Sequence, residues 1–252
     1  MSIAMGALLA AQPAQSIESV LKQVQANVAK FEAQLPDFVV DESILSRTLA
    51  DKRVLLEATY ENVFTGVQKR NQIFSFTESR EVMRHNRRDA QQGETMRVPF
   101  LFSGGFSSTL HSTFGAKSVP LHRFRVKSSN RLGDFATVVV EFATVPGQKE
   151  LHLDWQGKTV YEHAAGTAWL DPSTLEVIRL QRRYSRLPWP AVSLTVTVDY
   201  KMVLIEGRLY NLPVKISVEQ GVDKSQKRAR GVFVAEYSNY RKFQVSSGIK
   251  FD

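Results

Sequence analysis

Residues 192–218 read VSLTVTVDYKMVLIEGRLYNLPVKISV, and this stretch decides the fold of the chain. In its first half, apolar residues alternate with polar ones, a period of two that is typical of an antiparallel strand with one dry face. The apolar positions are Val192, Leu194, Val196, Val198, Tyr200, Met202 and Leu204. Glu206-Gly207-Arg208 supplies a turn, and the alternation returns from Leu212 to Val218. Two long dry faces need an apolar cover, so the sequence predicts a curved sheet around a helix or a guest molecule.

Alternating, β-branched and aromatic residues recur along most of the chain after Asp37. We expect further strands over residues 38–49, 54–67, 72–84, 121–131, 135–144, 149–155, 158–170, 175–185 and 230–243. Asp171-Pro172-Ser173-Thr174 fits a type I turn, because proline presets φ at the second position. The sequence contains neither an internal repeat nor a convincing linker, so residues 16–252 are expected to form one domain.

Two helices are expected, each with an apolar face that can cover the sheet. Ser16 can cap a helix that runs to about Gln34, and Pro36 ends it. The residues with the spacing of one helical face are Ile17, Val20, Leu21, Val24, Val28, Phe31 and Leu35. A second, short helix is predicted around Phe106, Leu110 and Phe114. Gly115 ends it, and its place between strands makes it a candidate plug for the concave side of the sheet.

The composition narrows the classes of partner. The chain has 252 residues, no cysteine and a formal net charge of +8. The lack of cysteine excludes disulfides, thiolate metal sites and cysteine nucleophiles. The basic surface should attract anions such as lipid head groups or acidic proteins. Nucleic acid is not an expected partner, because the basic clusters are not interleaved with aromatic residues. The sequence also holds no apolar stretch of the roughly 20 residues that span a bilayer, so no transmembrane segment is expected.

The N-terminus bears on localisation. Residues 3–11 form a small apolar run, and Gln12-Pro13-Ala14-Gln15 follow it, as is typical near a signal-peptide cleavage site. No Lys or Arg precedes Lys22, so the basic front of a signal peptide is missing. We interpret residues 1–15 as a truncated signal peptide, which predicts a periplasmic or secreted protein. A disordered N-terminus is the alternative.

Motifs for catalysis, metal or cofactor binding are not found. The histidines, His85, His111, His122, His152 and His163, lack the spacing of metal sites. Two pairs could serve as acid and base: His152 with Asp154 on one strand face, and Ser107 with His111 one helical turn apart. The glycines before Ser107 do not match a nucleophile elbow, and His152 and Asp154 fit two exposed polar positions. We therefore predict neither an enzyme nor a metal or cofactor site.

Two basic clusters remain. The first comprises Arg179, Arg182, Arg183 and Arg186, and the second comprises Lys224, Lys227, Arg228 and Arg230. One hypothesis is that the first cluster docks an anionic head group or an acidic partner, with peripheral membrane contact. The alternative is an edge strand protected by charge, next to a solvated loop.

The order of these features resembles a known family. After the N-terminal helix and the early strands come Gly166-Thr167-Ala168-Trp169-Leu170-Asp171-Pro172, then Tyr200…Gly207…Tyr210-Asn211-Leu212-Pro213, and finally residues 237–243, YSNYRKF. This pattern resembles the periplasmic lipoprotein-carrier superfamily, which is LolA/LolB-like and includes the sigma-factor regulator RseB as a relative. The resemblance implies an α+β fold: a strongly curved, unclosed antiparallel β-barrel with an N-terminal helix and a short plug helix on its concave side. The cysteine of the lipid-anchored branch is absent.

These observations predict a non-catalytic binding protein for a lipid, a lipoprotein acyl chain or a similar amphiphile. The predicted lining of the cavity is Val138, Val140, Phe142, Leu194, Val196, Val198, Tyr200, Val214, Ile216, Phe106, Leu110 and Phe114. The alternative is a protein-interaction or envelope-stress sensor module whose helices fill the sheet and leave no room for a small ligand. A wide cavity would favour the first function, and a filled interior would favour the second.

Overall fold

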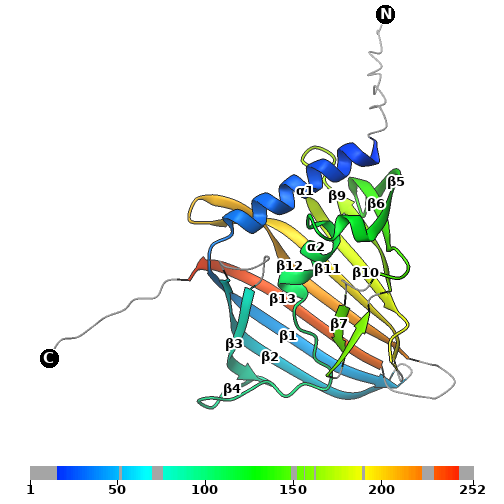
Figure 1. Ribbon diagram of the computed structural model, residues 1–252. Coiled ribbons are helices and arrows are strands. Elements are labelled where there is room, and N and C mark those ends of the chain that lie inside the picture. The colour runs from blue at the N-terminus through cyan, green and yellow to red at the C-terminus, as the bar shows by residue number, and fades with distance from the viewer. Residues whose placement is uncertain are drawn as a thin grey trace, which may run out of the picture.

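The structure is a computed structural model, and it describes residues 16–50, 53–69, 76–148, 152–155, 157–161, 163–188, 191–222 and 230–243. Within these ranges, a long antiparallel sheet curls around two α-helices (Figure 1). The helical elements are α1 (Ile17–Gln34), α2 (Gly105–Phe114) and a short 3-10 helix (Val119–Leu121). The strands are β1 (Phe38–Ala50), β2 (Arg53–Gln68), β3 (Phe76–His85), β4 (Arg88–Asp89), β5 (His122–Leu132), β6 (Phe135–Thr144), β7 (His152–Trp155), β8 (Lys158–Tyr161), β9 (Ala164–Leu170), β10 (Val177–Ser185), β11 (Ala191–Ile205), β12 (Arg208–Val222) and β13 (Arg230–Lys242).

The main sheet has the strand order β4-β3-β2-β1-β13-β12-β11-β10-β9-β6-β5. Most neighbours are also consecutive in the sequence, but β1 pairs with β13 from the other end of the chain, with Ile44 opposite Ala235. The two ends of the sheet, at β4 and at β5, do not pair with each other, so the curled sheet stays open (Figure 1). This confirms the predicted α+β class and the unclosed, strongly curved barrel with both helices on its concave side.

Helix α1 forms where the sequence predicts it. The Ser16 side chain accepts a hydrogen bond from the backbone N–H of Ser19 at 3.3 Å and so caps the first turn. Val20, Val24 and Val28 lie on one face and are buried against the sheet. α1 is not long and apolar enough to cross a membrane, and the same holds for every other helix in the described ranges.

An irregular segment, residues 90–104, joins α2 in covering the concave side of the sheet. The Ser46 hydroxyl donates to the Phe100 carbonyl at 2.7 Å and accepts from the Phe100 N–H at 3.0 Å. Tyr60 makes the same pair of bonds with the backbone of Arg97. Gly231 allows this close approach, because a Cβ there would lie 2.4 Å from the Phe100 ring. This segment therefore packs on β1, β2 and β13, next to Phe106 of α2, which contacts the same strands.

One predicted strand is divided. Residues 158–170 form two separate strands: β8 pairs with β7 in a small two-stranded sheet, whereas β9 pairs with β6 and β10 in the main sheet. The β11–β12 hairpin forms as predicted, with Gly207 at φ 78° in its turn. Its register shifts between Asp199 and Tyr200, so Val214 has no direct partner across the pair.

Candidate functional site

The interior of the curled sheet is filled with the protein's own side chains. Phe106, Leu110 and Phe114 of α2 are at most 5% exposed, and they belong to one core that includes the inner faces of β1, β6 and β9–β13. The other predicted lining residues that belong to this core are Val140, Phe142, Leu194, Val196, Val198, Tyr200 and Ile216, and Val138 packs against it, partly buried. Val214 lies half-buried in the bulge of the β11–β12 hairpin. These residues pack on one another, so they line a core and not a wide cavity.

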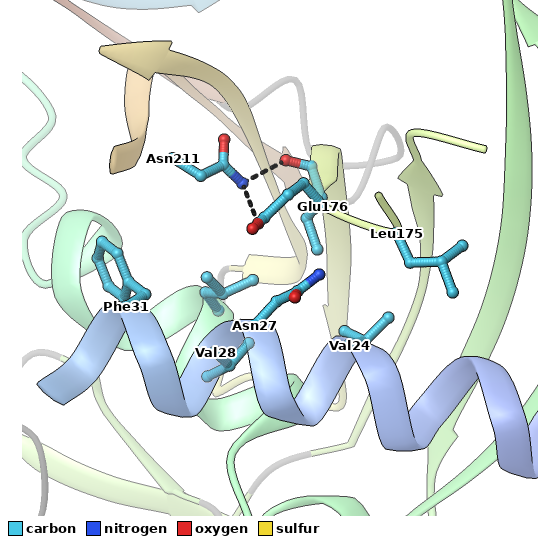
Figure 2. Close-up of a pocket in the computed structure, with 9 residues that line it drawn as sticks. Val24, Asn27, Val28, Phe31, Leu175, Glu176 and Asn211 are labelled. Atoms are coloured by element: carbon cyan, nitrogen blue, oxygen red, sulfur yellow. Dashed lines mark hydrogen bonds between the residues drawn. The ribbon is translucent and has the colours of Figure 1, made fainter. Parts of the chain in front are cut away.

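A small enclosed cavity lies between α1, α2 and the sheet (Figure 2). Its volume is about 10 Å³, which is roughly the space that one water molecule requires. Val24, Val28 and Phe31 of α1 line one side of it, and Leu110 lines another. On the polar side, the Asn211 amide donates to the Glu176 carboxylate at 3.2 Å and to the Val177 carbonyl at 2.9 Å. An acyl chain does not fit into this space unless the helices move.

Two larger hollows are open to solvent. One, of about 1200 Å³, lies between α1, the β9–β10 turn and the end of the β11–β12 hairpin, where Lys22, Lys30 and Met202 line it. The other, of about 880 Å³, is lined by Arg179, Tyr200 and Val214 from the predicted set, together with Phe135, which is 74% exposed. Three predicted residues therefore do reach a hollow, but this hollow is a different place from the plugged interior.

The predicted docking cluster of four arginines is split: Arg182 lies on the inner face of β10, Arg179 and Arg183 lie on its outer face, and Arg186 follows the strand. Arg182 is fully buried and points toward α2, where its guanidinium donates to the Ser112 hydroxyl at 2.6 Å and to the Thr113 hydroxyl at 2.9 Å. It also lies 5.6 Å from the Phe142 ring centroid. Placing Arg182 on a docking surface was wrong, because the alternation of the strand puts it on the inner face with Leu180.

The other three arginines lie outside the core. Arg183 and Arg186 are exposed, and Arg179 forms an ion pair with Asp199 across the β10–β11 pair. A docking role for these three stays a prediction. In the second basic cluster, Lys224, Lys227 and Arg228 lie outside the described residues.

His122 joins the polar group around Arg182. Its Nδ1 donates to the Ser118 carbonyl at 2.8 Å, and its Nε2 lies 3.5 Å from the Arg182 guanidinium. Burial lowers the pKa of His122 to about 4, and the nearby positive charge of Arg182 acts in the same direction, against the hydrogen bond to Ser118. The imidazole is therefore neutral at pH 7 and links the start of β5 to β10 beneath α2.

This low pKa predicts that His122 makes the fold less stable in acid. Above pH 6.5, the ordinary pKa of histidine, His122 is neutral in both the folded and the unfolded state, so its titration does not change the free energy of unfolding. Below pH 6.5 the histidine binds a proton in the unfolded state but stays neutral in the folded state, and this favours unfolding. Between pH 6.5 and pH 4 the free energy of unfolding should therefore fall by up to about 3 kcal/mol through this residue. Urea unfolding at steps from pH 7 to pH 4 measures the fall. His122→Asn should show a shallower slope, and parallel slopes for the two proteins would contradict the assignment.

Of the side chains in the two acid–base pairs noted in the sequence, that of His111 lies in the described part of the structure. His111 bonds to the Glu32 carboxylate of α1, so it ties the two helices together. The side chains of Ser107, His152 and Asp154 lie outside the described part of the structure. Among the residues that are described, no cluster of three His, Asp or Glu side chains could hold a metal ion.

A second buried polar group was not predicted. Glu42 on the inner face of β1 is 2% exposed, and it accepts hydrogen bonds from Arg80 of β3 at 2.8, 3.0 and 3.1 Å. Asn62 of β2, which lies between them, donates to the same carboxylate at 2.9 Å. Burial raises the pKa of the neighbouring Tyr237, and the charge of Glu42 adds to this effect. The sequence does hold a signal for Glu42, because Val40, Glu42 and Ile44 are two residues apart along β1 and therefore lie on the same face.

Comparisons with known proteins give structural neighbours only. No family model and no curated protein matches the chain. Among solved structures, the chain is similar to a LolA superfamily protein from Nitrosomonas europaea, with 11% identity, a TM-score of 0.39, and 95% of this chain and 99% of that one covered. It is also similar to a DUF1329 family protein from Desulfovibrio piger, with 9% identity, a TM-score of 0.43, and 93% and 95% covered.

A third similar structure, from Vibrio parahaemolyticus, is described as an outer membrane lipoprotein-sorting protein domain. The identity is 12% and the TM-score is 0.47, with 91% of this chain and 93% of that one covered. These similar structures include a LolA superfamily protein, and LolA-like proteins are the group that the sequence pattern resembles.

Proposed function

We propose that this chain is a non-catalytic, periplasmic or secreted protein-interaction module that binds another protein through its surface. The observation that carries the proposal is the filled interior: α1, α2 and residues 90–104 occupy the concave side, and the enclosed cavity is about 10 Å³. Within the described ranges, a small ligand therefore has no interior site to enter without rearrangement. The apolar run at residues 3–11 supports export from the cytoplasm.

The energetics of α2 also favour a permanent core. Phe106, Leu110 and Phe114 are almost fully buried, and burial of each such side chain contributes about 1.5–3 kcal/mol. An acyl chain of about ten methylenes would gain ~8 kcal/mol on burial, which is close to what α2 would lose on leaving. The displaced helix would also give up its bonds to Arg182 and Glu32. Exchange of helix for ligand is therefore nearly balanced at best.

An amphiphile carrier with α2 as a movable plug is the second candidate function. It is supported by the way α2 is attached: Gly104 precedes it in a left-handed conformation with φ 78°, and no side chain caps its first turn. The irregular segment before Gly104 and Gly115 after the helix could allow α2 to swing away. Such a carrier would bind its ligand only weakly, because α2 competes for the same space.

Native mass spectrometry on protein exported to a bacterial periplasm tests the proposal. We expect the mass of the bare polypeptide, and no uptake of an added fluorescent fatty acid, because the interior is filled. A bound amphiphile at near-stoichiometric level would contradict the interaction module and favour the carrier. The interior could then be tested further with Leu110→Asp, which should abolish uptake. The matched exposed variant on the same helix, Ser108→Asp, should keep it.

A further inference from the structure

The sheet ends at β5, which offers a free backbone edge. β5 pairs with β6 alone, and the register is regular from His122 opposite Thr144 to Lys127 opposite Val139. In the described residues no other strand pairs with β5, and Figure 1 shows it at the rim of the sheet beside the N-terminal end of α1. Along residues 122–127, every second N–H and C=O therefore points away from β6, where another strand can bind.

The two faces of this edge differ in chemistry. Arg123, Arg125 and Lys127 are exposed on the outer face. Phe124 and Val126 alternate with them, half-buried, and pack against the core. The Phe124 ring stacks on Phe114 of α2, with centroids 5.7 Å apart. A strand added to β5 would therefore place the side chains of one face beside three cations and those of the other face beside the apolar side chains of Phe124 and Val126.

The outer face of β5 keeps an excess of positive charge. Arg125 and Lys127 form ion pairs with the same carboxylate, that of Glu141 on β6, and these two cations lower the pKa of Glu141. No ion pair of Arg123 is found within the described ranges. Three cations thus face one anion, so the edge is complementary to a strand that carries carboxylates at alternate positions.

This charge pattern also argues against a second copy of the chain as the partner. Pairing of two β5 edges would place like charges opposite each other, which is destabilising. A second copy could instead offer the part of β3, at the other end of the sheet, that has one strand neighbour in the described residues. Its outward residues are Thr77, Ser79 and Glu81, so it would place one carboxylate beside the three cations of β5. A segment of another protein, with acidic residues alternating with apolar ones, fits better.

We propose that β5 binds an extended segment of a partner protein by adding it to the sheet as a further strand, with acidic side chains beside Arg123, Arg125 and Lys127 and apolar ones over Phe124 and Val126. This inference rests on the proposed function and names its partner class. The competing explanation is that the charges only protect the edge from aggregation. A strand partner and a protected edge differ in whether the backbone takes part in binding.

Fluorescence anisotropy with labelled peptides tests the inference. A peptide Glu-Val-Glu-Val-Glu-Val-Glu should bind at low ionic strength at least about tenfold more tightly than a block peptide of the same composition, Glu-Glu-Glu-Glu-Val-Val-Val. N-methylation of alternate residues on its pairing edge should remove that advantage. Equal binding of the alternating, block and N-methylated peptides would overturn the inference, because binding would then depend on charge alone.

Charge reversal gives the matching test on the protein. The triple variant Arg123→Glu, Arg125→Glu, Lys127→Glu should lose the acidic peptide and bind Lys-Val-Lys-Val-Lys-Val-Lys instead. Unchanged preference would overturn the inference. Sedimentation velocity gives a further test. A dimer of the wild-type protein that the triple variant does not form would also overturn the inference, because the edge would then bind a second copy of the chain. A different result would contradict the proposed function, namely a bound amphiphile in native mass spectrometry, and that experiment uses no peptide.

Discussion

Arg182→Ala is expected to lower the free energy of unfolding by about 3–5 kcal/mol, which is at the upper end for a single substitution. The guanidinium joins β10 to α2 through the hydroxyls of Ser112 and Thr113, and it contacts the aromatic rings of Phe142 and Tyr184. Alanine would leave a cavity beneath α2 and remove the donor from the buried hydroxyl of Thr113 and the half-buried one of Ser112. Urea unfolding monitored by circular dichroism measures the change.

Arg183→Ala is the matched control, because Arg183 is the next residue on the same strand and is exposed on the outer face. Its replacement should change the free energy of unfolding by no more than about 0.5 kcal/mol. Arg182→Met, which fills most of the volume, should recover part of the loss. A small effect of Arg182→Ala, similar to that of Arg183→Ala, would contradict the buried position of Arg182.

The same pair of neighbours shows what could be predicted from the sequence. Strands with a strict period of two were found because each has one face against the core: residues 135–144 are a strand as predicted, and β13 ends one residue earlier than expected. The end of helix α1 was predicted near Gln34, and the helix ends there, since its capping serine and Pro36 are local signals. Local patterns thus gave the elements and most of their boundaries.

Features that depend on contacts between distant segments were missed. Three arginines on one strand and a fourth directly after it look like a surface cluster. Arg182, however, has Leu180 two residues before it and Tyr184 two residues after it, and these mark its face as the inner one. The cover of β1 and β2 by residues 90–104 has no periodic signal, because it rests on bonds such as Ser46 with Phe100. Whether the interior is filled depends on such contacts between segments that are far apart in the sequence.

Glu42→Gln should lower the free energy of unfolding by about 3–5 kcal/mol, because it removes the charge from a buried pair and leaves its partner. The Glu42 side chain is fully buried and Arg80 is 15% exposed, so neither ion can turn to water to recover its hydration. Arg80 also lies 4.8 Å above the Phe64 ring, which holds it in place. Loss of the carboxylate would thus leave a desolvated cation between β3 and the core.

The exposed pair of Arg47 and Glu57 is the control on the neighbouring β1–β2 ladder, with both side chains about 40% exposed. Glu57→Gln should cost no more than about 1 kcal/mol, since water screens that pair. Hydrogen exchange gives a second measurement: Glu42→Gln should speed exchange first in β3, which the Glu42–Arg80 contact ties to β1 across β2. Equal unfolding free energies for Glu42→Gln and Glu57→Gln would contradict a stabilising role of the buried pair, and β3 would then be held by its ladder with β2 and by packing on Phe64.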